Sequence, residues 1–241
     1  MKKCLRRFSI KGFQEVTLID WDGKIASIIF CGGCNFRCGF CHARGLVLDE
    51  EGIEAVPFDS VESFLKEKKG WIDGVVITGG EPTLDEKELI GLIEAIRGLS
   101  LPVKLDTNGS RPNVLKDLIA SNSVDFIAMD VKAPFNAQAY SMAVNAPVEI
   151  KDIIESRDIV LDSGIEHEFR TTVVPGIVDI SAIAEIARSI AGARRYCLQQ
   201  FVPRDTINPS FLDITPYPAE ELNRMATVAS EHLNDVVIRN N

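Results

Sequence analysis

The sequence lacks the excess of basic residues that marks a nucleic-acid-binding protein. Lys and Arg number 26 against 35 Asp and Glu, which gives a formal net charge of −9. Because binding to nucleic acid depends on clustered Lys and Arg that contact phosphates, we expect no nucleic acid as the main partner. The sequence also lacks an apolar run long enough to span a membrane, so we expect no membrane partner. It shows no targeting segment, which predicts a reducing, cytoplasmic environment.

Linkers, low-complexity segments and internal repeats are absent as well. With 241 residues, 46% of them hydrophobic, and a mean hydropathy of +0.07, the chain can bury one large core. We therefore expect a single domain over 1–241, with a core at about 26–203. A strand-rich leader at 1–25 and an extension of helix and strand at 204–241 are expected to flank this core.

Cysteine is sparse but clustered. Three of the six cysteines lie in the run Cys34-Asn-Phe-Arg-Cys38-Gly-Phe-Cys41. A [4Fe–4S] cluster normally takes a cysteine on each iron, so three thiolates leave one iron open. An open iron can chelate a small molecule and pass an electron to it. The spacing therefore favours a catalytic cluster over one that only transfers electrons.

Other readings of the same cysteines stay open at this point. With Cys31 added, the run could supply four ligands to a structural zinc ion or to a closed cluster, although structural zinc sites usually separate their two cysteine pairs by a longer finger. A disulfide is less favoured, because no secretory signal precedes the run. Cys4 and Cys197 lie far apart in the sequence, and we expect both to be buried thiols.

A second motif follows the cysteine run by about 40 residues. The apolar segment at 75–78 leads into Gly79, Gly80, Glu81 and a proline, which predicts a buried strand that ends in a sharp turn. Glycines at such a turn allow the backbone to approach a ligand closely. The Glu81 carboxylate is expected at the mouth of the strand, where it could accept hydrogen bonds from an ammonium group.

Together these motifs resemble the radical S-adenosylmethionine (SAM) superfamily, whose hallmark is C-x3-C-x2-C followed by Gly-Gly-Glu. Further matches are similar to the activases of glycyl-radical enzymes: Asp106-Thr107-Asn108-Gly109, Met129-Asp130-Val131-Lys132, and Phe40 and His42 around the last cysteine. The segments 168–176 and 199–201 look more like the branch that activates anaerobic ribonucleoside-triphosphate reductase than the pyruvate formate-lyase branch. The resemblance spans roughly 10–203.

The resemblance implies an enzyme that reduces SAM by one electron at a [4Fe–4S] cluster. Cleavage yields methionine and a 5′-deoxyadenosyl radical, which removes a hydrogen from a glycine of a partner enzyme. The cofactors implied are the cluster, SAM and a monovalent cation. The partners implied are anaerobic ribonucleotide reductase and, as electron donor, flavodoxin or ferredoxin. Alternatives are a pyruvate formate-lyase activase, a small-molecule enzyme such as a 7-carboxy-7-deazaguanine synthase, and a non-enzymatic metal-binding module.

The resemblance also implies roles for individual residues. Cys34, Cys38 and Cys41 ligate iron, and Gly79, Gly80 and Glu81 meet the methionine amine of SAM. The other expected cofactor-binding residues are Phe40 against adenine, His42, Asp106 and Asp130 near the SAM carboxylate and the cation, Thr107, Lys132, and Arg170. Two acids near a carboxylate repel one another unless a cation or Lys132 offsets them. For Arg170, a bond to SAM and a structural ion pair both remain open.

Apolar runs alternate with amphipathic stretches along the chain, which predicts βα units around a parallel sheet. Strands are expected at 26–31, 74–78, 102–106, 125–131, 167–174 and 195–202, with an edge strand at 236–238. Helices are expected at 60–68, 85–99, 112–121, 148–162, 181–191 and 218–232. Six such units predict an α/β fold with a partial (β/α)6 TIM-like barrel, which the resemblance also implies. The motifs then fall at the carboxyl ends of the strands, where barrels of this kind carry their chemistry.

Overall fold

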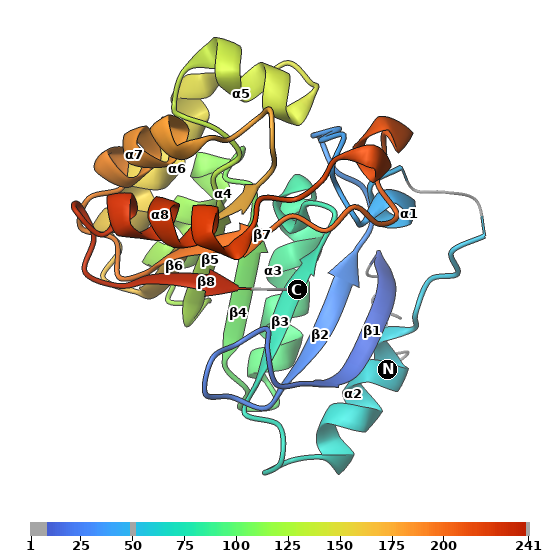
Figure 1. Ribbon diagram of the computed structural model, residues 1–241. Helices are drawn as coiled ribbons and strands as arrows, with labels where there is room; N and C mark the ends of the chain where they lie inside the picture. Colours follow the sequence, from blue (N-terminus) through green and yellow to red (C-terminus); the bar gives the residue numbers. More distant parts are fainter. Residues whose placement is uncertain (1–8, 49–51, 240–241) are drawn as a thin grey trace.

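A computed structural model describes residues 9–48 and 52–239. Its centre is one eight-stranded sheet in the order β1 to β8, which curves through the molecule as a partial barrel (Figure 1). β1 pairs antiparallel with β2, and every later pair is parallel. The strands are β1 (Ile10–Thr17), β2 (Ala26–Cys31), β3 (Gly74–Gly79), β4 (Val103–Thr107), β5 (Phe126–Asp130), β6 (Glu166–Val173), β7 (Tyr196–Gln200) and β8 (Val236–Arg239).

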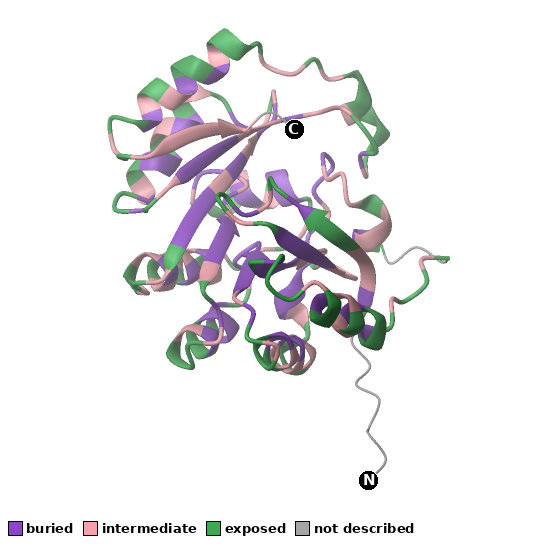
Figure 2. Cartoon of the chain, turned by 90° about the horizontal axis from the view of Figure 1, so that it is seen from below, coloured by how far each residue is buried: buried purple, intermediate pink, exposed green. Residues whose placement is uncertain are grey.

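Helices connect the parallel strands and cover the outer face of the sheet (Figure 1). They are α1 (Arg44–Leu48), α2 (Phe58–Glu67), α3 (Glu86–Arg97), α4 (Pro112–Ala120), α5 (Ala137–Val144), α6 (Ile150–Asp162), α7 (Ile180–Ser189) and α8 (Ala219–Ala229), with two 3-10 turns, η1 (Pro82–Leu84) and η2 (Pro209–Asp213). Seen from below, the strands are largely buried and the helices expose their outer sides (Figure 2). Within the described residues, no helix combines the length and the apolar character needed to cross a membrane.

The predicted α/β fold and its six central strands are confirmed, each strand within two residues of its expected bounds. The sheet is larger than six strands because the leader supplies β1 and the extension supplies β8. β8 is the expected edge strand, and it pairs in parallel with β7 through Tyr196 and Val236. The six predicted helices are present as well, although α8 ends at Ala229, three residues before the predicted end.

Local sequence explains these elements. β2 and β3 read Ala-Ser-Ile-Ile-Phe-Cys and Gly-Val-Val-Ile-Thr-Gly, near-continuous apolar runs of the kind found in parallel strands buried on both faces. α3 begins after Asp85, whose carboxylate accepts a hydrogen bond from the backbone N–H of Glu88 at 2.9 Å. Sequence analysis missed α5, although Asn136 caps its start through the N–H of Ala139 and Asn145 ends it with a positive φ of 47°.

Alternation along the strands separates two environments. Leu105 belongs to the main hydrophobic core, while its neighbours Lys104 and Asp106 point the other way, toward the inside of the barrel. On β6, Phe169 is likewise in the core, and Glu168 and Arg170 face the charged side chains of β4. The inner face of the sheet therefore carries charged side chains on β4 and β6, and β5 adds Asp130 at its carboxyl end.

Candidate active site

A cavity of about 530 Å³, counted with its solvent-open mouth, lies at the carboxyl ends of β2 to β6. Eleven of the thirteen predicted site residues line it: Cys34, Cys38, Cys41, Gly79, Gly80, Glu81, Asp106, Thr107, Asp130, Lys132 and Arg170. The other two, Phe40 and His42, are not among its lining residues. Phe36, Val47 and Asn108 line the cavity although sequence analysis gave them no role.

The glycine pair after β3 is required by the cysteine loop. A Cβ at Gly79, where φ is 121°, would stand 2.4 Å from the carbonyl oxygen of Cys31, and a Cβ at Gly80 would stand 1.7 Å from that of Gly33. The N–H of Gly80 donates to Cys31 O at 2.9 Å, and the N–H of Glu81 donates to Gly33 O at 2.8 Å. Close approach was expected toward a ligand. In the structure, the Cβ directions are occupied by the backbone of the cysteine loop, which is thereby fixed against β3.

Glu81 is a buried junction between loops. Its Oε1 accepts from the N–H of Thr83 at 3.1 Å, the hydroxyl of Thr83 at 2.5 Å and the hydroxyl of Thr107 at 2.8 Å. Its Oε2 accepts from the backbone N–H of Asn108 at 2.6 Å. Burial raises the pKa of Glu81, and these donors oppose that rise. The carboxylate therefore joins the loops after β3 and β4, and its expected bond to the SAM amine stays a prediction.

The three cysteines line one cavity, with Cys38 buried and Cys34 and Cys41 partly buried. Desolvation raises the pKa of Cys34 to about 11 and that of Cys38 to about 12, while the Lys132 ammonium acts in the opposite direction on both. Metal binding must therefore displace protons from these thiols. Among the described residues, no three His, Cys, Asp or Glu side chains converge on a single metal ion. A cube does not require such convergence, because each thiolate binds a different iron.

Cys31 lies apart from the other three. It ends β2 and lines a neighbouring cavity with Ser9, Asp85 and Glu88. Burial, with the nearby carboxylates of Glu81 and Glu88, raises the pKa of its thiol to about 12. The donor set that faces the main cavity therefore consists of three cysteines, which fits a cluster with one open iron. Cys197, expected as a buried thiol, is indeed buried, and Cys4 lies outside the described residues.

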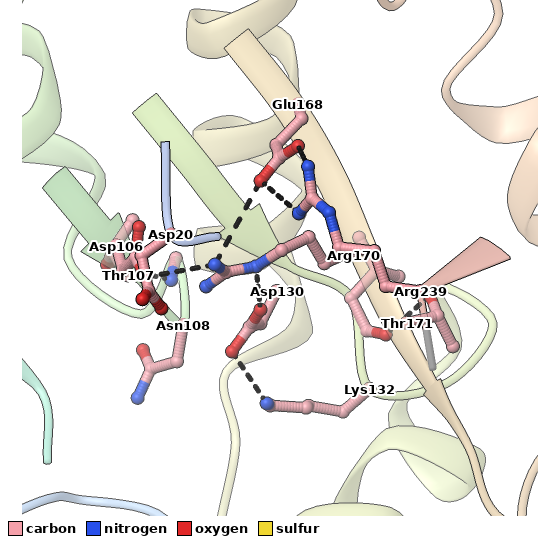
Figure 3. Close-up of polar contacts among 12 residues, drawn as sticks. Asp20, Asp106, Thr107, Asn108, Asp130, Lys132, Glu168, Arg170, Thr171 and Arg239 are labelled. Atoms are coloured by element: carbon pink, nitrogen blue, oxygen red, sulfur yellow. Dashed lines mark hydrogen bonds and ion pairs between the residues drawn. The ribbon is translucent and has the colours of Figure 1, made fainter. Parts of the chain in front are cut away.

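Four charged residues form the polar wall of the cavity (Figure 3). The Arg170 guanidinium donates to Asp106 Oδ2 and to Asp130 Oδ1, both at 2.9 Å, and Lys132 Nζ donates to Asp130 Oδ2 at 2.8 Å. Burial would raise the pKa of Asp130, but the charges of Arg170 and Lys132 lower it to about 2. Arg170 thus forms the structural ion pairs that sequence analysis left open. The buried Asp106 Oδ1 receives no hydrogen bond within the described residues, although Lys104 Nζ lies 3.7 Å away.

A second group of charges lies two residues deeper along the strands. Lys104 and Glu168 are 2% and 1% exposed, and their Nζ and Oε1 atoms are 3.5 Å apart. Lys104 Nζ also donates to Asp20 O at 2.5 Å. Arg239 of β8 donates to both oxygens of Glu168, at 3.0 and 2.8 Å. Sequence analysis missed this group, although Lys104 and Glu168 stand two residues before Asp106 and Arg170 and so face the same side.

The C-terminal extension packs on the cysteine loop. η2 lies beside this loop in space (Figure 1), and the N–H of Asn208 donates to Gly39 O at 2.9 Å. Phe40 is buried, with its ring 6.2 Å from that of Phe211, and His42 Nε2 lies 2.5 Å from Val202 O. Phe40 thus packs on this extension, and His42 contacts the segment just before it. Their expected contacts with SAM stay predictions.

Comparisons with known proteins show which proteins the chain resembles. The family model of the Radical SAM superfamily matches residues 28–190. A protein of Methanocaldococcus jannaschii assigned as a glycyl-radical enzyme activating enzyme is 32% identical over 234 residues, 95% of each chain. The pyruvate formate-lyase-activating enzyme of Streptococcus mutans is 24% identical over 209 residues, 81% of this chain and 78% of its own. Streptococcus suis SuiB bound to S-adenosylmethionine shares the fold, with a TM-score of 0.66 and 16% identity over 87% of this chain and 48% of that chain.

Proposed function

The chain belongs to the radical SAM superfamily and to its glycyl-radical enzyme activating enzymes, and from this premise we propose that it generates a glycyl radical on anaerobic ribonucleoside-triphosphate reductase. Membership makes it an enzyme of this type, with a [4Fe–4S] cluster and SAM as its cofactors. The observation that carries the SAM-cleaving part of the proposal is the meeting of Cys34, Cys38 and Cys41 with the Asp106, Arg170 and Asp130 group in one cavity.

The three cysteines would hold the cluster, and their number leaves one iron free for a chelating ligand. When bound, the cluster supplies the single electron that reductive cleavage of SAM requires. The protein contributes position and exclusion of water. Cys38, Phe36 and Val47 are buried and apolar, so they screen this part of the cavity from solvent.

The polar wall suits the methionine end of SAM, which carries an ammonium and a carboxylate. The Asp106 carboxylate lines the cavity and its Oδ1 receives no hydrogen bond from the described residues, which supports a role for this carboxylate beside the ammonium or the expected monovalent cation. Lys132 and Arg170 are the cations of the same wall and can face the SAM carboxylate. The charges of the four residues sum to zero, so the zwitterionic part of SAM can enter without leaving an uncompensated buried charge.

The choice of target rests on sequence features and not on the cavity. The segments at 168–176 and 199–201 favour the reductase. The competing target is pyruvate formate-lyase, because the chain is also similar to a pyruvate formate-lyase-activating enzyme. The electron donor we propose is a flavodoxin or ferredoxin, because the sequence has no further cysteine cluster to relay electrons. A reducing cytoplasm suits the five free thiols of the described residues.

The test is anaerobic activation with defined targets. The reconstituted protein is mixed with SAM, a reductant and either the anaerobic ribonucleotide reductase or the pyruvate formate-lyase of the same cell. We expect methionine and 5′-deoxyadenosine in both mixtures and a doublet glycyl-radical signal in electron spin resonance with the reductase alone. A signal with the lyase alone would transfer the function to that target. SAM cleavage that depends on a metabolite, with no glycyl signal on either protein, would instead favour a small-molecule enzyme.

A further inference from the structure

We propose that Asn108 is a positioning residue that raises the reduction potential of the cluster by donating an N–H···S hydrogen bond to the Cys34 thiolate. The inference rests on the proposed function, because it requires the cluster to be bound by Cys34, Cys38 and Cys41. It concerns a residue of the Asp-Thr-Asn-Gly run to which sequence analysis gave no role of its own.

The Asn108 side chain reaches from the loop after β4 to the cysteine loop. Its Nδ2 lies 3.8 Å from Cys34 Sγ and donates to Asn35 Oδ1 at 2.9 Å. Its backbone N–H is held by Glu81, as described above, and the whole residue is 6% exposed. Asn108 therefore has a fixed main chain and a side chain directed at an iron ligand.

The orientation of the amide is determined by its partners. Asn108 Oδ1 accepts a hydrogen bond from the backbone N–H of Ser110 at 2.9 Å. Exchanging the oxygen and nitrogen would set two N–H donors against each other at Ser110 and would place an oxygen lone pair against the sulfur. The donor must therefore face Cys34. Asn35 supports this arrangement, since its own Nδ2 donates to Ser110 Oγ at 2.9 Å and so fixes its Oδ1 toward Asn108.

Cys34 receives a second donor from its own loop, the backbone N–H of Phe36 at 3.3 Å from the sulfur. A donor on a thiolate withdraws electron density from the sulfur and stabilises the extra negative charge of a reduced cluster, which raises its potential. The effect is strengthened where water is excluded. The 3.8 Å separation makes the Asn108 contribution the weaker of the two, but this contribution can be removed by changing a side chain.

The same contacts couple the two halves of the site. The loop that carries Asp106 and Thr107 is joined to the cluster loop through Asn108 and through the bond between Asn35 and Ser110. A change at Asn108 is thus expected to act on the cluster first. SAM binding is expected to change less, because the charged wall of Asp106, Arg170 and Asp130 does not hydrogen-bond to Asn108 through any contact seen among the described residues.

The experiment is a redox titration of the reconstituted protein, monitored by electron spin resonance, with iron content and thermal unfolding measured on each sample. Asn108→Ala is expected to shift the midpoint potential of the cluster to a more negative value. Asn108→Asp is expected to shift it further, because a carboxylate replaces the donor beside the sulfur. The control is Asn113→Ala, an exposed asparagine at the start of α4, for which we expect the wild-type potential.

A full cluster with the wild-type potential, or a more positive one, in Asn108→Ala would overturn the inference. If that variant holds too little cluster to titrate, Asn35→Ala carries the test, because it removes the acceptor that orients the amide. A smaller negative shift supports the inference, and an unchanged potential overturns it. A wild-type protein that takes up no cluster would instead refute the proposed function, so the two failures are distinguishable.

Discussion

Two groups of charged side chains occupy the inner face of the same sheet, and they differ in what they leave open. The outer group, at the cavity, consists of Asp106, Asp130, Lys132 and Arg170. The inner group, two residues deeper along β4 and β6, consists of Lys104, Glu168 and, from β8, Arg239. Both contain opposite charges at hydrogen-bonding distance, so the presence of ion pairs does not tell a binding site from a structural one.

Hydrogen bonding separates the two groups better than exposure does, since the Arg239 side chain of the inner group is itself 23% exposed. In the outer group, the side chains of Asp130 and Lys132 are 26% and 15% exposed, and Asp106 Oδ1 has no hydrogen-bond donor among the described residues. In the inner group, both oxygens of Glu168 are bound by Arg239, and Lys104 has a carbonyl and a carboxylate. The outer group retains capacity for a ligand, and the inner group stabilises the fold.

The largest expected effect compares a thiol of the cavity with a thiol of the inner region. Cys38→Ala removes one of three iron ligands, so we expect loss of the cluster and of SAM cleavage. Cys197, on β7, is near the charges of Glu168 and Arg239 and does not line the cavity. Cys197→Ala and Cys31→Ala are expected to retain both. Iron content and 5′-deoxyadenosine production measure the outcome, and loss of the cluster in Cys31→Ala alone would point to a closed four-cysteine site.

The next effect is on stability. Glu168→Ala removes a buried carboxylate from the Lys104 ammonium, which keeps the Asp106 carboxylate at 3.7 Å, and from Arg239, which keeps Asp22. Breaking a buried pair in this way typically costs about 3–5 kcal/mol of the free energy of unfolding. Glu166→Ala is the matched control two residues earlier on β6. Its side chain is 63% exposed and pairs with a half-exposed Arg194, so we expect a loss of at most about 1 kcal/mol. Anaerobic urea unfolding measures the free energy of unfolding of both variants. Equal losses in the two would mean that the inner group does not stabilise the fold.

An acid titration tests the outer group. The folded pKa of Asp130 lies below its unfolded value, so its stabilising contribution is complete above about pH 5 and is lost as the pH falls toward 2. This contribution is about 2 kcal/mol. Asp130→Asn should therefore show a shallower loss of stability across that window, measured by urea unfolding at each pH. Asp213→Asn, at an exposed position in η2, should follow the wild type. A parallel loss in Asp130→Asn would mean that its ion pairs do not contribute.

Much of the fold and the position of the site were predictable from the sequence. The cysteine spacing, the Gly-Gly-Glu turn and the strand periodicity predicted a partial barrel with its site at the carboxyl ends, because these signals are local in sequence. The contacts of Arg170 were not predictable, because a guanidinium can pair with a ligand or with the protein. Which of the two occurs depends on the distances between side chains of β4, β5 and β6, and the sequence does not give these distances. The contact of the Phe40 ring with Phe211 was not predictable either, because Phe211 is remote in sequence. The deeper group required the register of β8 beside β7, which periodicity does not give.

The smallest expected effect concerns SAM affinity and asks whether the outer group serves the ligand as the comparison implies. Asp130 orients the two cations of the cavity wall, since Arg170 and Lys132 each donate to one of its oxygens. Asp130→Ala should release both cations while sparing the cysteines, so we expect a full cluster and SAM binding weakened about tenfold, or about 1.4 kcal/mol. Equilibrium binding of SAM to cluster-loaded protein measures this, with Asp213→Ala as the control. Unchanged affinity would mean that Asp130, like Glu168, serves only to stabilise the fold. Asp106 would then be the acid of the outer group that remains as a candidate for binding SAM.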